Sequence, residues 1–426
     1  MDHVVAARAQ MGTSLAFHIV FAALGVGLPL LVFIAEGLWL RTKDPAYDVL
    51  ARQLAKAMGI LFAVGAVSGT VVAFQLGLLW PGFMRYAGGI IGMPFSLEGF
   101  AFFIEAIFIG IYLYGRERLT PLQHWLALIP VMVSGAASAA FVTLANAWMQ
   151  MPTGFRIVGG KVADVQPLVA MFAEPWKIQV VHATLAAYAF TGCATAAVCA
   201  LARLFGNPRP TVLAGVRVAM LTGTVAVALQ IVSGDVMARF DAEHEPAKFA
   251  AMEVVRHTAT HVPLTVGGIP AGGDIKYTLE IPELLSYLVG FSADTQIRGW
   301  NEVRPADRAP VPATHLSFDA MVGSGSLLLL IGAGWSFLWW RKRDENAWVL
   351  RTVAVSGLAA FVALEAGWFV TEFGRQPWIA VGLQRTSDAA TLAPGVELAF
   401  FCFTGMYVVL ATTTGWLLYK IGQGTA

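Results

Sequence analysis

Long apolar runs, separated by short polar connections, make up most of the chain. They fall at about 13–40, 57–80, 95–115, 125–148, 178–204, 212–232, 318–340, 350–371 and 396–420. Each run is long enough for an α-helix to cross a bilayer, which takes about 20 residues. A helix pairs its own backbone groups, and lipid offers them no other partner. The pattern therefore predicts an all-α, polytopic membrane protein with nine transmembrane helices.

One long polar segment interrupts this pattern between the sixth and seventh runs. Residues 233–315 hold many charged side chains, with prolines and glycines among them. Connections of that length are usually functional or disordered. We therefore expect helices one to six over 1–232, an external loop over 233–315 and helices seven to nine over 316–426.

The basic residues predict how the helices are oriented in the membrane. Short connections rich in lysine and arginine stay on the cytoplasmic side. The connections after helices one, three, five and seven are of this kind, with Arg41, Lys43, Arg52, Lys56, Arg116, Arg118, Arg203, Arg209, Arg341, Lys342, Arg343 and Arg351. The amino terminus and the loop over 233–315 are then expected outside, and the carboxyl terminus in the cytoplasm.

Composition supports a membrane protein and narrows its partners. Hydrophobic residues make up 57% of the chain and charged residues 13%, which is more apolar surface than a soluble protein can bury. The net charge of +1 gives no indication of a nucleic-acid partner. Cys193, Cys199 and Cys402 lie in apolar runs without CxxC spacing, so neither a disulfide framework nor a thiolate metal site is indicated.

Side chains that are energetically unfavourable in lipid gather at one depth of the predicted bundle. Ionisable residues inside a membrane helix are expensive and usually mark a functional site. With the predicted orientation, the outer half of five helices holds His18, Glu98, Glu105, His182, Met321, Trp368 and Glu372. Glu98 and Glu105, seven residues apart, share one helix face at a separation of about 10 Å along the axis.

Histidines, a methionine and carboxylates in one layer favour haem chemistry. Histidine and methionine are axial ligands of haem iron, and the pair of them is typical of an electron-transferring haem. A buried carboxylate pair can hold or relay protons. Singly, each residue has a structural explanation, such as an interhelical hydrogen bond for a histidine or core packing for Met321. Together they predict a redox or proton-coupled site.

Motifs spread over nearly the whole chain point to one family. Residues 374–378 read GRQPW, with Glu372 two positions before them. Leu97 to Glu105 forms a paired-glutamate helix, residues 146–154 read NAWMQMPTG, and residues 8–29 surround His18. These motifs resemble subunit I of the cytochrome bd-type quinol oxidases, and the GRQPW motif is highly specific for that family.

The resemblance implies a set of haem ligands. His182 and Met321 would ligate a low-spin haem b that receives electrons from quinol. His18 and Glu372 would ligate a high-spin haem b and a high-spin haem d (or a second haem b in its place), where oxygen is reduced. Which of these haems each residue serves stays open. Trp368 would lie between haems as an electron bridge.

The resemblance also implies a proton route. Glu98 and Glu105 would lie beside the high-spin haems. His124 and Ser138 match a path that leads protons from the cytoplasm to Glu105. For Ser138, simple helix packing is the alternative.

Other residues would handle quinol and the haem propionates. Lys248 and Glu253 resemble a quinol-binding element, in which a cation and an acid bind and deprotonate the hydroxyl groups. The alternative is a solvated ion pair on a short helix. Arg375 would hold a haem propionate. One position departs from the family: Asp319 stands two residues before Met321, where an arginine is usual.

These observations predict a terminal respiratory oxidase subunit in the bacterial plasma (inner) membrane. It would be a quinol:oxygen oxidoreductase, electrogenic without pumping, paired with a polytopic subunit II and with a possible small single-helix accessory subunit. The alternatives are a proton-coupled transporter using Glu98, Glu105 and Glu365, or a quinol-oxidising cytochrome b that never reduces oxygen. Ubiquinol and menaquinol both stay open as the donor.

Overall fold

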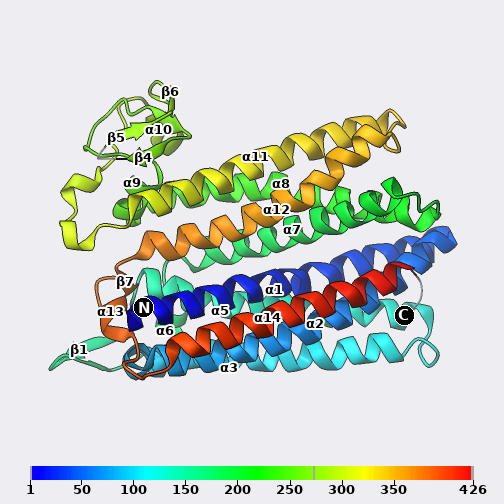
Figure 1. The fold of residues 1–426 in the computed structure, drawn as a ribbon, viewed down its shortest axis with the longest axis horizontal. Coiled ribbons are helices and arrows are strands. Elements are labelled where there is room, and N and C mark those ends of the chain that lie inside the picture. The colour runs from blue at the N-terminus through cyan, green and yellow to red at the C-terminus, as the bar shows by residue number, and fades with distance from the viewer. Residues whose placement is uncertain (1, 272–273, 424–426) are drawn as a thin grey trace.

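The computed structural model describes residues 2–271 and 274–423 as a bundle of long helices with a small lobe at one end (Figure 1). Within those residues, nine helical spans are long and apolar enough to cross a membrane. They are α1 (His3–Thr42), α2 (Pro45–Leu79), α3 (Pro81–Tyr114), α4 (Pro121–Leu126) with α5 (Leu128–Gln150), α7 (Trp176–Leu204), α8 (Pro210–His244), α11 (Val311–Trp340), α12 (Ala347–Arg375) and α14 (Val396–Gln423). The predicted all-α, nine-helix fold is confirmed.

Several helices begin well before the apolar run that predicted them. α1 begins at His3 rather than near 13, α2 at Pro45 rather than near 57 and α3 at Pro81 rather than near 95. A proline is accommodated at the first helical position because its missing N–H has no partner there in any case. The Asp44 side chain caps α2 by accepting a 2.9 Å hydrogen bond from the Ala46 N–H. The apolar runs alone miss these first turns, which carry charged residues in α2 and several glycines in α3.

The described residues between α8 and α11 form a lobe, which begins after His244 because α8 continues to that residue rather than ending near 232. Its elements are α9 (Pro246–Met252), β3 (Leu264–Val266), β4 (Ile269–Ala271), β5 (Asp274–Lys276), β6 (Leu279–Ile281), α10 (Leu284–Gly290), η1 (Trp300–Glu302) and η2 (Pro305–Asp307). β3 pairs with β6 and β4 with β5, both antiparallel. Buried Phe249, Val255, Leu285 and Ile297 form an apolar cluster of the lobe's own.

Two shorter connections lie at the same end of the bundle as the lobe and the amino terminus (Figure 1). The first contains β1 (Arg156–Val158), β2 (Lys161–Ala163) and α6 (Pro167–Met171). The second contains β7 (Trp378–Ala380), β8 (Gln384–Arg385) and α13 (Thr386–Ala389). Structured connections therefore gather at one end of the helices.

Small residues allow α1, α7 and α8 to approach closely. A Cβ atom built on Gly192 would lie 2.6 Å from the Cα of Gly223, so only a residue without a side chain fits at this crossing of α7 and α8. On α7, the Thr191 hydroxyl donates a 3.0 Å hydrogen bond to the Ala23 carbonyl of α1 and packs against Gly27. Close packing and interhelical hydrogen bonds hold membrane helices together where lipid removes the hydrophobic driving force. These contacts fix the helices that carry His18 and His182.

Candidate functional site

A large cavity lies between the helices, with a volume of about 2350 Å³. A pocket for one small ligand usually has about 300–1,000 Å³, so this cavity has room for several. Most of the side chains predicted for the site line it: His18, Glu98, Glu105, Ser138, His182, Lys248, Glu253, Met321, Trp368, Glu372 and Arg375. Of the predicted residues, only His124 lies elsewhere among the parts of the chain that the structure describes.

His18 and His182 are held by matching hydrogen bonds. Nδ1 of His18 lies 2.9 Å from the Ser68 hydroxyl, and Nδ1 of His182 lies 3.0 Å from the Ser233 hydroxyl. Each hydroxyl donates its own hydrogen to a backbone carbonyl of its helix, so it accepts one from the histidine. Both rings therefore carry their hydrogen on Nδ1 and present a lone pair at Nε2. This is how neighbouring groups orient a histidine that binds a metal.

Nε2 of His182 has a neighbour that supports this assignment. The Gln230 side-chain nitrogen lies 2.9 Å from it, and an amide N–H can only donate. The ring nitrogen is therefore the acceptor. A stronger electron-pair acceptor such as haem iron would take the place of the Gln230 amide, whose oxygen has no hydrogen-bond partner in the described residues.

Glycines on facing helices make room beside the expected ligands. A Cβ atom at Gly69 would lie 3.0 Å from Cε1 of His18, and one at Gly367 would lie 3.1 Å from Sδ of Met321. Both distances are tighter than ordinary carbon contacts at about 3.5–4.0 Å. The imidazole and the thioether thus pack directly on the backbone of α2 and α12. Nitrogen and sulfur donors beside a large apolar cavity fit haem.

Glu372 and Arg375 form an ion pair at the end of α12. One guanidinium nitrogen of Arg375 lies 2.9 and 2.8 Å from the two carboxylate oxygens of Glu372, and another donates a 2.9 Å bond to the Asn146 side chain. Arg375 is only 5% exposed. The GRQPW and NAWMQMPTG motifs therefore meet here. The Nε of Arg375 has no partner within the described residues, which leaves a buried donor for an anionic group such as a propionate.

The paired acids of α3 face α5, each with a different contact. The Ser138 hydroxyl donates a 3.1 Å bond to Glu98. Glu105 is buried against Gly135, where a Cβ atom would lie 3.1 Å from its carboxylate oxygen. Ser138 thus contacts Glu98 directly, and the path through His124, Ser138 and Glu105 stays a prediction.

Lys248 is buried and paired, but not with Glu253. Its ammonium nitrogen lies 2.9 Å from the Asp241 carboxylate and 3.3 Å from that of Glu245. Burial alone would lower the pKa of Lys248, but the two carboxylates outweigh burial and raise the pKa above its ordinary value. The alternative of a solvated ion pair is wrong because Lys248 is 5% exposed. Gly374 leaves room for its aliphatic stem, since a Cβ there would lie 2.7 Å from Lys248 Cγ.

Glu253 is buried at the end of α9, where another carboxylate lies nearby. Burial, and next the nearby Asp319 carboxylate, raise the pKa of Glu253 to about 8. Asp319 lies 3.3 Å from Nε2 of His315, whose Nδ1 donates a 2.7 Å bond to the Met252 carbonyl. His315 therefore lies between the Asp319 carboxylate and the Met252 carbonyl. The four-residue spacing of His315 and Asp319 could have indicated their contact, whereas the Met252 carbonyl, 63 residues away, reaches His315 only in the folded chain.

Glu365 is a further acid of the cavity. It lies on the face of α12 that also carries Trp368 and Glu372, three and seven residues on. It is 8% exposed, and neither carboxylate oxygen has a hydrogen-bond partner in the described residues. Its position in the cavity makes it part of the same polar layer.

Comparison with known proteins decides what kind of protein has this geometry. Residues 6–425 match the family described as cytochrome bd terminal oxidase subunit I. The chain belongs to this family. A putative cytochrome bd menaquinol oxidase subunit I from Bacillus subtilis (strain 168) is 36% identical, covering 98% of this chain and 96% of the relative. The cytochrome bd-II ubiquinol oxidase subunit 1 of Escherichia coli (strain K12) is 28% identical, covering 99% and 96%.

A solved structure agrees with the sequence relatives. The bd oxidase from Geobacillus thermodenitrificans superposes with a TM-score of 0.95 at 34% identity, covering 100% of this chain and 99% of that one. Family membership makes the chain a haem-carrying, multi-pass bacterial membrane subunit of a terminal quinol oxidase that acts with a subunit II. The predicted family, fold and activity are confirmed, and neither the transporter nor the oxygen-independent cytochrome b is favoured.

Proposed function

We propose that this subunit binds quinol beneath the lobe between α8 and α11 and reduces oxygen inside the central cavity. The observation that supports the proposal most is the common cavity of His18, His182, Met321 and Glu372, which come from α1, α7, α11 and α12. Donors that are far apart in the sequence share one apolar space large enough for several cofactors.

The cofactors proposed are a low-spin haem b at His182 and Met321, and a high-spin haem b and a high-spin haem d (or a second b) at His18 and Glu372. When bound, haem supplies electron transfer and an open iron position for oxygen. Ser68 and Ser233 hold the rings of His18 and His182 through Nδ1, so Nε2 lies on the opposite side of each ring. Trp368 contributes an aromatic wall to the cavity.

Buried groups near the haem ligands handle charge and protons. Arg375 is proposed to exchange part of its pairing with Glu372 for a haem propionate, using its buried Nε donor. Glu98 and Glu105 are proposed to hold protons that oxygen reduction consumes. Both carboxylates line the cavity, so a proton held there has a short path to the reaction.

Quinol binding is proposed at Lys248 and Glu253, which also line the cavity. Lys248, kept charged by Asp241 and Glu245, can donate a hydrogen bond to a quinol oxygen. The Glu253 carboxylate can accept the proton that a quinol hydroxyl releases. Burial of both groups strengthens these polar contacts.

We expect quinol oxidation to speed up with rising pH until about pH 8. Glu253 accepts a proton only as a carboxylate, and burial together with Asp319 raises its pKa to about 8. Below that pH the protonated form dominates and cannot act as a base; above it the rate levels off. The measurement is the anaerobic rate of haem reduction by added quinol as a function of pH.

The variant Glu253→Gln removes the base while keeping the shape. It should lower the rate and abolish the rise with pH. Glu280→Gln on the exposed strand β6 serves as the control and should keep the wild-type profile. An unchanged pH profile in Glu253→Gln would end the assignment of Glu253 as the proton acceptor.

The proposed orientation puts the amino terminus and the lobe outside and the carboxyl terminus in the cytoplasm. The Lys- and Arg-rich connections after α1, α3, α7 and α11 support it, because such connections stay inside. Protons released from quinol would then leave outward and protons for water would come from inside, which separates charge without a pump. A polytopic subunit II, and a small single-helix accessory subunit, are the proposed partners.

Spectroscopy and oxygen uptake test the proposed function together. The purified membrane complex should give reduced-minus-oxidised haem bands, a change with carbon monoxide, and quinol-driven oxygen consumption. A colourless protein would favour the transporter. Haem bands without a carbon monoxide response or oxygen uptake would favour the oxygen-independent cytochrome b.

A further inference from the structure

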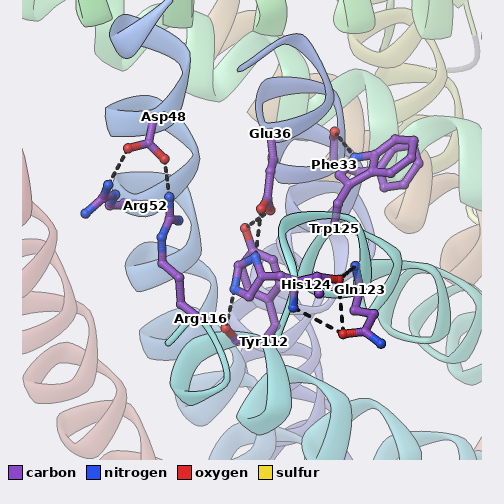
Figure 2. Close-up of polar contacts among 10 residues, drawn as sticks. Phe33, Glu36, Asp48, Arg52, Tyr112, Arg116, Gln123, His124 and Trp125 are labelled. Atoms are coloured by element: carbon purple, nitrogen blue, oxygen red, sulfur yellow. Dashed lines mark hydrogen bonds and ion pairs between the residues drawn. The ribbon is translucent and has the colours of Figure 1, made fainter. Parts of the chain in front are cut away.

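A buried polar cluster lies near the end of α1 that is remote from the lobe (Figure 2). Its members are Glu36 on α1, Tyr112 on α3 and His124 on α4, and they are 1%, 2% and 3% exposed. None of them lines the haem cavity as the structure describes it. Ionisable groups buried in a membrane helix bundle are expensive and usually functional.

The hydrogen bonds of this cluster define where its protons are. The Tyr112 hydroxyl donates a 2.6 Å bond to one oxygen of Glu36, and Nδ1 of His124 lies 2.7 Å from the other. Nε2 of His124 lies 2.9 Å from the backbone carbonyl of Tyr112. A carbonyl can only accept, so Nε2 carries a hydrogen. A single proton is then left between Nδ1 of His124 and the carboxylate of Glu36.

That proton can occupy either side of the contact. With the proton on Nδ1, the pair is an imidazolium and a carboxylate; with the proton on Glu36, both groups are neutral. Moving it breaks one N–H bond and forms one O–H bond, and no other atom has to change partner. In both forms the same neighbours provide the hydrogen bonds of the two groups. A site that holds a proton and passes it on requires this.

Neighbouring contacts hold the pair in place. The Trp125 indole N–H donates a 2.9 Å bond to the Phe33 carbonyl, and the two rings stack at 4.4 Å. The short helix α4 is thereby fastened to α1 beside Glu36. The charged groups nearby, Asp48 with Arg52 and Arg116, pair with one another (Figure 2).

One helix face connects the cluster to the acids of the cavity. Glu98, Glu105 and Tyr112 follow each other on α3 at seven-residue intervals, and each interval is two helical turns, or about 10 Å. Tyr112 therefore lies one such step beyond Glu105, on the side away from Glu98. The Tyr112 hydroxyl donates a hydrogen bond to Glu36. The cluster therefore lies at the end of the series Glu98, Glu105 and Tyr112 along α3.

We propose that Glu36 and His124 together hold one exchangeable proton and supply it along α3 toward Glu105. This inference rests on the proposed function, because oxygen reduction is what would consume the proton. Glu36 is the new element, because no pattern along the chain indicates it as the partner of His124. The pair acts through Glu105 and positions a proton; within the described residues, neither group lines the haem cavity.

The variant Glu36→Gln tests the proposal in the haem-loaded membrane complex. Glutamine keeps the size and can still accept from Tyr112, but it cannot take up the proton. Quinol-driven oxygen uptake should fall by about 100-fold, the lower end of what the loss of an acid–base group usually causes. Anaerobic haem reduction by quinol and the melting temperature should stay at wild-type values, because neither needs this proton.

Asp48→Asn is the matched control, since it removes a carboxylate at the same end of the bundle, and it should keep the wild-type turnover. Glu36→Asp keeps the acid but lengthens the contact, so it should show an intermediate rate; it also replaces Glu36→Gln if that variant fails to assemble. Wild-type turnover in the available Glu36 variant overturns the proposal. A parallel fall in turnover, anaerobic haem reduction and melting temperature also overturns the proposal, because that pattern indicates that Glu36 only stabilises the fold.

The failure of the proposed function would look different. In that case the wild-type complex itself would not consume oxygen with quinol. A loss confined to the Glu36 variants, in an enzyme whose wild type is active, supports the proton-holding pair.

Discussion

The variant Met321→Leu should lose the low-spin haem signal and give a high-spin or labile haem instead. Leucine matches methionine in volume but has no donor atom, so the iron would lose one axial ligand. Quinol-driven oxygen uptake should fall at least about tenfold, since even loss of an outer partner of a metal site costs that much. The measurement is the reduced-minus-oxidised spectrum together with haem content after purification.

Met220→Leu is the control for this substitution. Met220 is a buried methionine on α8 that does not line the cavity in the described residues. Exchange of methionine for leucine in a packed interior usually costs less than about 1.5 kcal/mol, so the control should keep the wild-type spectrum. A low-spin spectrum that survives in Met321→Leu would remove Met321 from the proposed ligands.

Glu105→Ala should slow oxygen reduction while the haem bands persist. Glu105 is 5% exposed, packs on Gly135 and lines the cavity. Without its carboxyl group, protons have no holding site at this point of α3, and the rate should fall by about 100-fold, which is typical for a lost proton-transfer group. Turnover in an oxygen electrode and the haem spectrum are measured on the same preparation.

Two further variants separate proton transfer from packing. Glu105→Gln fills the same space beside Gly135, so it should be as slow as Glu105→Ala if the proton matters. Glu174→Gln, an exposed position between α6 and α7, should leave the rate unchanged. Wild-type turnover in Glu105→Gln would assign Glu105 a packing role.

Hydrophobic patterning was sufficient to predict the number and approximate position of the membrane helices. A helix that crosses lipid needs a continuous apolar run of about 20 residues, and such runs are visible without any knowledge of contacts. The ends of the helices were less predictable. The charged first turns of α2 and the polar continuation of α8 to His244 carry no hydropathy signal, and glycines interrupt the apolar pattern at the start of α3.

The sequence by itself also determined which side chains are candidates for chemistry. Ionisable residues are rare in apolar runs, and the GRQPW motif with Glu372 is specific enough to indicate a family. His18, His182, Met321 and Glu372 were therefore identified from the chain alone, and all of them line one cavity. Their roles as haem ligands stay predictions.

Only the tertiary structure decided which of these groups are partners. Glu36 and His124 are 88 residues apart, Ser138 bonds to Glu98, and Lys248 pairs with Asp241. A pattern along one helix tells which face is polar, but the neighbour of that face depends on how helices distant in the sequence pack together. Pairing sets the charge and the hydrogen position of each group, and for that reason the proton chemistry became visible only in the folded chain.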